Sequence, residues 1–174
     1  MTIDYRGPLC LCGKRGCIEM YASGQAISKR ARARLIAARR GTLTRGASAK
    51  RRTAASSKLL ELADGNLEDV TAEMVGKASM EVDPLATKVL EDAAESFAIW
   101  LGGIIDLLEP DVIVVGGGLG HLMASFFGFM RAQLERWSIN PRGHEVPIVS
   151  AMYGAVSGIA GAAALCRQAH RSKD

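Results

Sequence analysis

The sequence lacks a long apolar run, has few aromatic side chains and begins without a secretion signal. A membrane-spanning helix needs about 18 or more apolar residues in a row, but Pro110 and acidic residues interrupt the apolar stretches around Trp100 and Val114. The first residues, MTIDYRGPL, show no basic segment followed by an apolar one. These absences predict a cytoplasmic protein with no membrane partner.

Acidic residues are missing from one segment of the chain. Eleven basic residues and no acidic one lie between Lys29 and Lys58, whereas the whole sequence holds 22 basic and 18 acidic residues. Such a block is typical either of nucleic-acid binding or of a solvated, arginine-rich helix followed by a loop. Because the block has no aromatic residue on which a base could stack, we favour the solvated helix and do not expect nucleic acid as a partner.

The remaining composition is that of one ordinary globular domain. The chain has 174 residues, of which 48% are hydrophobic and 23% charged, and this length allows a sizeable core. The first half predicts a cysteine-rich and glycine-rich loop over 1–18 and a helix over 24–40. A basic, flexible segment over 41–57 follows, and then short helices near 57–63 and 71–78.

The second half has the stronger periodicity. Asp83 and Pro84 form a good helix start, apolar residues recur at helical spacing up to Leu108, and Pro110 ends the helix. Two short apolar runs, 112–115 and 147–150, are typical of buried parallel strands. Helices over 119–137 and 156–169 follow them. The alternation predicts an α/β fold with right-handed crossovers.

Three of the four cysteines lie close together, at Cys10, Cys12 and Cys17, whereas Cys166 stands alone. In a chain without a signal peptide, such clustering favours metal binding over disulfides. Thiolates suit a structural Zn²⁺, which takes four ligands, but all three histidines are remote in the sequence. The fourth ligand therefore stays open, and three reduced, unligated cysteines remain the alternative.

These residues resemble the ROK family of repressors, open reading frames and sugar kinases. The pattern Cys-x-Cys-Gly-x-x-Gly-Cys-x-Glu, from Cys10 to Glu19, is the most specific part. The segment Tyr21-Ala-Ser-Gly24, the run PDVIVVGGG ending at Gly118, and the stretch from Tyr153 through Gly161 follow in the family's order. The resemblance covers nearly the whole chain.

The resemblance implies an actin-like, ribonuclease H-like sugar kinase fold of the bacterial glucokinase kind. That kind of enzyme transfers a phosphoryl group from ATP, with Mg²⁺, to the 6-hydroxyl of a hexose. It further implies that Cys10, Cys12 and Cys17 hold Zn²⁺ within a knuckle over 1–22, and that Glu19 accepts hydrogen bonds from sugar hydroxyls. The alternative for Glu19 is an acid placed by the helix dipole.

The resemblance also implies that Gly116, Gly117 and Gly118 contact the adenosine side of the nucleotide. The absence of Cβ atoms there would let a flat ligand approach the backbone. The alternative is a tight turn between strand and helix, which the chain must make at this point in any case.

The sequence departs from the family before the cysteine motif. It contains no Asp-x-Gly-Gly-Thr phosphate loop, no Asn-Asp pair carrying the catalytic base, and no Gly-Glu-x-Gly-His segment whose histidine completes the zinc site. We therefore expect the carboxy-terminal part of a ROK sugar kinase, truncated or started at an internal Met, with the amino-terminal lobe missing. Phosphoryl transfer needs a base and a phosphate cradle, so we expect no kinase activity from the chain alone.

Loss of that lobe would also affect the sheet and assembly. We expect only two of five strands in a marginal, aggregation-prone sheet, and a homo-oligomer is possible in such a family. Two other functions stay open: the sugar-sensing domain of a ROK transcriptional repressor, and a small basic, zinc-stapled binding module. The sequence does not identify the hexose.

Overall fold

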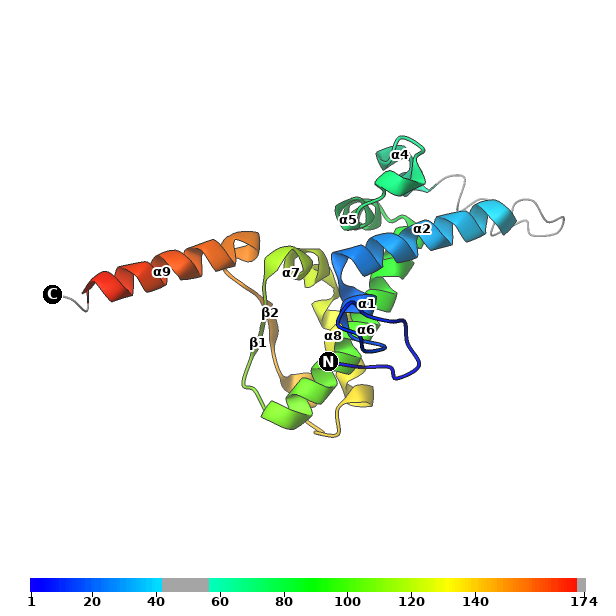
Figure 1. Cartoon of the computed structure of the whole chain (residues 1–174). Coiled ribbons are helices and arrows are strands. Elements are labelled where there is room, and N and C mark those ends of the chain that lie inside the picture. Colours follow the sequence, from blue (N-terminus) through cyan, green and yellow to red (C-terminus); the bar gives the residue numbers. More distant parts are fainter. Residues whose placement is uncertain (42–56, 172–174) are drawn as a thin grey trace.

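The structure is a computed structural model that describes residues 1–41 and 57–171 (Figure 1). Its helices are α1 (Glu19–Ala22), α2 (Gly24–Gly41), α4 (Lys58–Leu62), α5 (Ala72–Met80), α6 (Pro84–Leu108), α7 (Gly117–Met123), α8 (Phe127–Trp137) and α9 (Ser157–Arg171). Short 3₁₀ turns are η1 (Leu67–Asp69), η2 (Ala124–Phe126), η3 (Gly143–Glu145) and η4 (Gly154–Val156). Two strands, β1 (Ile113–Val115) and β2 (Ile148–Ser150), complete the described elements.

The long helix α6 is the centre of the fold. The Asp83 carboxylate caps its start by accepting a hydrogen bond from the Ala86 amide at 2.8 Å, and it also accepts from the Ser57 hydroxyl and the Lys58 amide. Helices α1, α2, α5 and α8 all pack against α6. Its fully or nearly fully buried side chains are Ala86, Val89, Leu90, Ala93, Ala94, Ala98, Leu101 and Ile105. One apolar helix thus holds the cysteine-rich start of the chain and the later α/β part together.

The sheet is small and open. Strands β1 and β2 run parallel, with Val114 opposite Val149 in the register. Ile148 and Val115 are buried, whereas Val114 and Val149 remain 59% and 41% exposed. Among the described residues the sheet has these two strands and no third, as the sequence predicted.

Most predicted elements are confirmed, but the helix predicted over 119–137 is wrong in two respects. The chain becomes helical already at Gly117, and the 3₁₀ turn η2 divides the segment into α7 and α8. Because Met123, Met130 and Leu134 are all completely buried, both pieces keep their apolar residues in the core. Helical periodicity alone does not distinguish a single helix from two pieces joined by a 3₁₀ turn.

Two other sequence predictions concern the basic segment and the absence of a membrane-spanning helix. The basic segment predicted over 41–57 falls, except for its end residues, outside the described residues. Within the described ranges, no helix combines the length and the apolar character that crossing a bilayer requires.

Candidate functional site

The cysteine motif folds as a compact backbone knuckle over residues 1–18. Leu9 pairs with Arg15, and Thr2 pairs with Cys17, as isolated antiparallel bridges. The Cys10 amide donates to the Lys14 carbonyl at 2.8 Å, which closes a tight turn around Cys12. Local hydrogen bonding thus brings the three cysteines together within one small loop.

The three sulfurs converge as a metal site requires. The Sγ atoms of Cys10, Cys12 and Cys17 all lie within 4.8 Å of one another, and those of Cys12 and Cys17 are 3.5 Å apart. In a tetrahedral zinc site with Zn–S bonds of about 2.3 Å, neighbouring sulfurs are about 3.8 Å apart. Cys10 and Cys17 are buried and Cys12 is exposed. The donor set therefore fits Zn²⁺, with Cys12 on the open side where a fourth ligand can approach.

The thiols at this site differ in acidity. A hydrogen bond from the backbone of Lys14 lowers the pKa of Cys12, and contacts with Cys17 and Cys10 lower it further. The hydrogen bond with Cys12 raises the pKa of Cys17, and burial adds to this rise. Cys12 is therefore the first of these two thiols to become a thiolate, the form that binds metal.

Gly16 ties the knuckle to the first residues of the chain. It has a φ of 63°, and a Cβ added there would overlap the carbonyl of Asp4. Its carbonyl accepts hydrogen bonds from the amides of Ile3 and Asp4, and its amide donates to the Pro8 carbonyl at 2.9 Å. A side chain at this position is therefore incompatible with the observed backbone.

Glu19 is the first residue of α1 and lies two positions after Cys17, the last cysteine of the motif. Its side chain is exposed, and among the described residues it makes no ion pair or hydrogen bond. Ile18 packs against the core and Ala22 is buried, so the helix that carries Glu19 is fixed while the carboxylate faces solvent. This arrangement suits a carboxylate that accepts hydrogen bonds from a ligand.

Tyr21 fixes α1 to the start of the chain, a role the sequence analysis did not assign. Its hydroxyl donates to the Asp4 carboxylate at 2.8 Å. Burial, followed by the effect of Asp4, raises the pKa of Tyr21 to about 12, so the phenol stays protonated and donates throughout the neutral range. The partners are 17 positions apart, and no local pattern marks such a pair.

The glycine run follows β1 and begins α7. Gly116 is the N-cap residue of α7, and Gly117 has a φ of 73°, a conformation that favours glycine. A Cβ at Gly118 would meet no atom within 4 Å. The tight turn between strand and helix, which is the alternative to nucleotide binding, accounts for the glycine at 117. It does not require the open space at Gly118, which leaves room for a ligand.

Asp106 supports the loop between α8 and β2. Its carboxylate accepts hydrogen bonds from the Ser138 hydroxyl and from the amides of Ile139 and Asn140. Burial by itself would raise the pKa of Asp106, but these hydrogen bonds outweigh it and lower the pKa below its ordinary value. The carboxylate anchors the segment that leads to the strand beside the glycine run, a long-range role that the sequence does not show.

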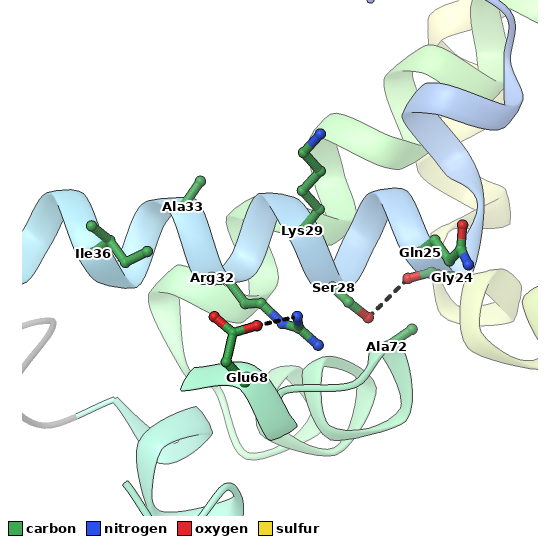
Figure 2. A pocket seen from close by; sticks show the side chains of 9 residues that line it. All are labelled: Gly24, Gln25, Ser28, Lys29, Arg32, Ala33, Ile36, Glu68 and Ala72. Carbon is green, nitrogen blue, oxygen red and sulfur yellow. Dashed lines mark hydrogen bonds and ion pairs between the residues drawn. The ribbon is translucent and has the colours of Figure 1, made fainter. Parts of the chain in front are cut away.

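The basic helix α2 is partly neutralised by acidic neighbours. Arg32 pairs with Glu68 at 3.0 Å, and Arg34 pairs with Asp92. Arg32 and Glu68 border a shallow groove of about 720 Å³ along α2, and Figure 2 shows Arg32 reaching toward Glu68 while Lys29 points away from it. The groove begins at Gly24, but none of the three clustered cysteines, Glu19 or the glycine run lines it, and its Arg–Glu pair is already satisfied.

Comparisons with known proteins agree with this arrangement. The ROK family profile matches residues 1–169. The chain is 28% identical over 163 residues to a glucokinase of Streptomyces coelicolor. The aligned region covers 93% of this chain and 47% of that protein. A ROK family glucokinase from Streptomyces griseus, solved with glucose and AMPPNP, superposes on the chain with a TM-score of 0.78 at 27% identity. The match covers 97% of this chain and 50% of that structure.

A third comparison concerns the repressor alternative. A ROK family transcriptional regulator, described as a homologue of the Escherichia coli MLC protein, superposes with a TM-score of 0.62 at 24% identity. It covers 86% of this chain and 33% of its own length, and at this identity it shows the shared fold alone.

These matches confirm the predicted actin-like sugar kinase fold and its partial extent. The chain spans about half the length of the curated glucokinase that it matches. The profile match extends over the knuckle, the glycine run and most of α9. The chain therefore belongs to the ROK family.

Proposed function

We propose that residues 1–174 form the sugar-binding, zinc-binding and adenosine-side half of an ATP-dependent hexose kinase, with glucose as the first candidate substrate. The observation that carries the proposal is the convergence of the three cysteine sulfurs directly before Glu19. The glucokinase from Streptomyces griseus, solved with glucose and AMPPNP, matches nearly the whole chain. The curated relative that is 28% identical is also a glucokinase, which favours a kinase over a repressor domain.

The sugar side of the proposal rests on the position of Glu19. A structural Zn²⁺ held by Cys10, Cys12 and Cys17 would stiffen the loop that ends at α1, and the packing of α1 already fixes the other end. An exposed carboxylate on such a support is preorganised to accept two hydrogen bonds from neighbouring sugar hydroxyls. The zinc would thus be structural, and the phosphoryl chemistry would use ATP and Mg²⁺.

The nucleotide side rests on the glycine run. Gly118 offers open space beside the amino-terminal end of α7, where the adenosine of ATP could lie against the backbone. The phosphate loop and the catalytic aspartate implied by the family resemblance would come from the amino-terminal half. We therefore propose that residues 1–174 phosphorylate a hexose only together with that half, in the cytoplasm, where ATP is available.

Replacing Glu19 tests the sugar site. The test protein, called the fusion kinase below, joins residues 1–174 to the amino-terminal half of the Streptomyces coelicolor glucokinase. Glu19→Gln should lower kcat/KM for glucose by about 100-fold, because two charge-assisted hydrogen bonds become weaker neutral ones. The matched control is Glu135→Gln, an exposed carboxylate on α8, which should leave kcat/KM unchanged. Equal activity of both variants would refute the role of Glu19.

Replacing Gly118 tests the nucleotide site. Gly118→Leu adds a side chain whose Cβ would meet no other atom of the protein within 4 Å. In the fusion kinase it should raise KM for ATP by more than about 10-fold and leave KM for glucose unchanged. Gly128→Leu is the matched control, because Gly128 is also an exposed helical glycine with no atom near its added Cβ. An unchanged KM for ATP in Gly118→Leu would show that nucleotide does not lie there.

A further inference from the structure

The beginning of the chain connects the loop that carries the cysteines with helix α1. The Asp4 amide donates to the Gly16 carbonyl at 3.3 Å, and the Ile18 amide donates to the Met1 carbonyl at 3.1 Å. Ile18 directly precedes α1. Residues 1–4, which we call the bridging segment, are therefore hydrogen-bonded both to the cysteine loop and to the start of this helix.

A side-chain hydrogen bond adds a second link between the bridging segment and α1. The Tyr21 hydroxyl donates to Oδ2 of Asp4 at 2.8 Å, while Oδ1 of Asp4 accepts from the Arg6 amide at 3.0 Å. The Gly7 amide donates to the Asp4 carbonyl at 3.0 Å and closes the turn that follows. Both oxygens of the carboxylate are thus engaged, and the turn holds the acceptor in place for the phenol.

Close packing also fixes the position of the phenol oxygen. Gly7 is buried, and a Cβ added there would overlap the Tyr21 hydroxyl oxygen and lie 2.7 Å from Cα of Gly16. The hydroxyl therefore occupies space that only a glycine at position 7 leaves free. Phenylalanine at position 21 would lack only this oxygen and would keep the rest of the ring.

The same short helix carries Glu19. Helix α1 has four residues, Glu19–Ala22, and its N-cap residue provides no side-chain hydrogen bond. A helix of one turn is not stable by itself, so contacts with its surroundings set its orientation. Packing on α2 and α6 holds one side of α1, and the hydrogen bond from Tyr21 to Asp4 holds the side toward the cysteine loop. Any rotation of α1 would move the Glu19 carboxylate.

We propose that Asp4 and Tyr21 are positioning residues for the sugar site, and that their hydrogen bond sets where the Glu19 carboxylate meets the sugar hydroxyls. The inference rests on the proposed function, because it takes Glu19 to bind the sugar. Tyr21 acts through α1 and Asp4 acts through Tyr21, so neither side chain needs to touch the sugar. A carboxylate that accepts from two neighbouring hydroxyls must be placed to within about 0.5 Å.

Tyr21→Phe in the fusion kinase tests the proposal. It should raise KM for glucose by about 10-fold, because it removes a hydrogen bond to a charged group. KM for ATP and the zinc content should stay unchanged. Tyr5→Phe is the matched control, since Tyr5 is 73% exposed in the same part of the chain and its hydroxyl makes no hydrogen bond within the described residues. A tyrosine with a purely structural role would lower the melting temperature without this selective change in KM.

Substitutions of Asp4 show whether the hydrogen bond itself is responsible. Asp4→Ala should raise KM for glucose at least as much as Tyr21→Phe does. Adding Tyr21→Phe to it should cause no further rise, because the partner of the hydroxyl is already lost. Asp4→Asn should keep KM within about threefold of the unmodified value, since its amide oxygen can accept from the Arg6 amide and its amide nitrogen can donate to the phenol oxygen.

Three results would overturn the positioning role and leave the proposed function intact. The first is an unchanged KM for glucose in Tyr21→Phe, and the second is a rise that the two substitutions, Tyr21→Phe and Asp4→Ala, cause additively. The third is an equal rise in KM for ATP or a loss of zinc from Tyr21→Phe, which would show a structural role. A folded, zinc-loaded fusion kinase that binds no glucose would contradict the proposed function and the positioning role together.

Discussion

Cys17→Ser is expected to remove zinc from the chain. Residues 1–174 purified with zinc should hold about one Zn²⁺ per molecule, and the variant should bind it at least about 100-fold more weakly, because serine replaces a buried thiol that we propose as a ligand. Cys17 also forms a backbone bridge with Thr2 and lies two residues before α1. Loss of zinc should therefore also make the first residues of the chain more mobile.

The measurement is metal content by mass spectrometry, followed by chelator competition. Cys166→Ser is the control, since Cys166 is an exposed cysteine on α9 and outside the sulfur cluster. Helical circular dichroism should persist in both variants, because the core around α6 is formed by other residues. Zinc should also leave as the pH falls, since protons compete with the metal for each thiolate. Full zinc content in Cys17→Ser, or none in the unmodified chain, would contradict the assignment.

Gly16→Ala is expected to disrupt the knuckle without touching any ligand. The added methyl group would overlap the Asp4 carbonyl, and alanine would have to adopt a φ of 63°. Overlap and backbone strain together cost about 3 kcal/mol or more, which corresponds to a loss of zinc affinity on the order of 100-fold. The expected result is weak zinc binding by a chain that keeps all three cysteines.

Gly13→Ala separates the overlap from the strain. Gly13 has a φ of 81° in the same loop, but its added Cβ would meet no atom within 4 Å. It should cost only about 1 kcal/mol, or about fivefold in zinc affinity. Chelator competition on both variants decides the matter, and equal affinities would show that the contact between Gly16 and Asp4 does not position the cysteines.

The sequence predicted the elements that depend on local patterns. The long helix up to Leu108 follows from its Asp-Pro start and its apolar spacing, and the cysteine cluster follows from the spacing of Cys10, Cys12 and Cys17. Their sulfurs do converge, because the glycines between them allow a tight loop. These features need only residues that are near one another in the chain.

The features that the sequence did not predict depend on distant partners. The Tyr21–Asp4 hydrogen bond and the Asp106 contacts join residues 17 and more than 30 positions apart. The 3₁₀ turn joins two pieces that meet different parts of the fold, because α8 packs on α6 whereas α7 contacts η4. The apolar spacing over 156–169 predicted a helix, but only the structure shows that Ile159 and Leu165 on it are exposed.

The most direct test of the central proposal is a coupled assay of glucose phosphorylation by ATP. We expect glucose 6-phosphate from the fusion kinase, about 100-fold less from its Glu19→Gln variant, and none from residues 1–174 alone. A folded, zinc-loaded fusion kinase that phosphorylates neither glucose nor another hexose would contradict the proposal that these residues are half of a sugar kinase.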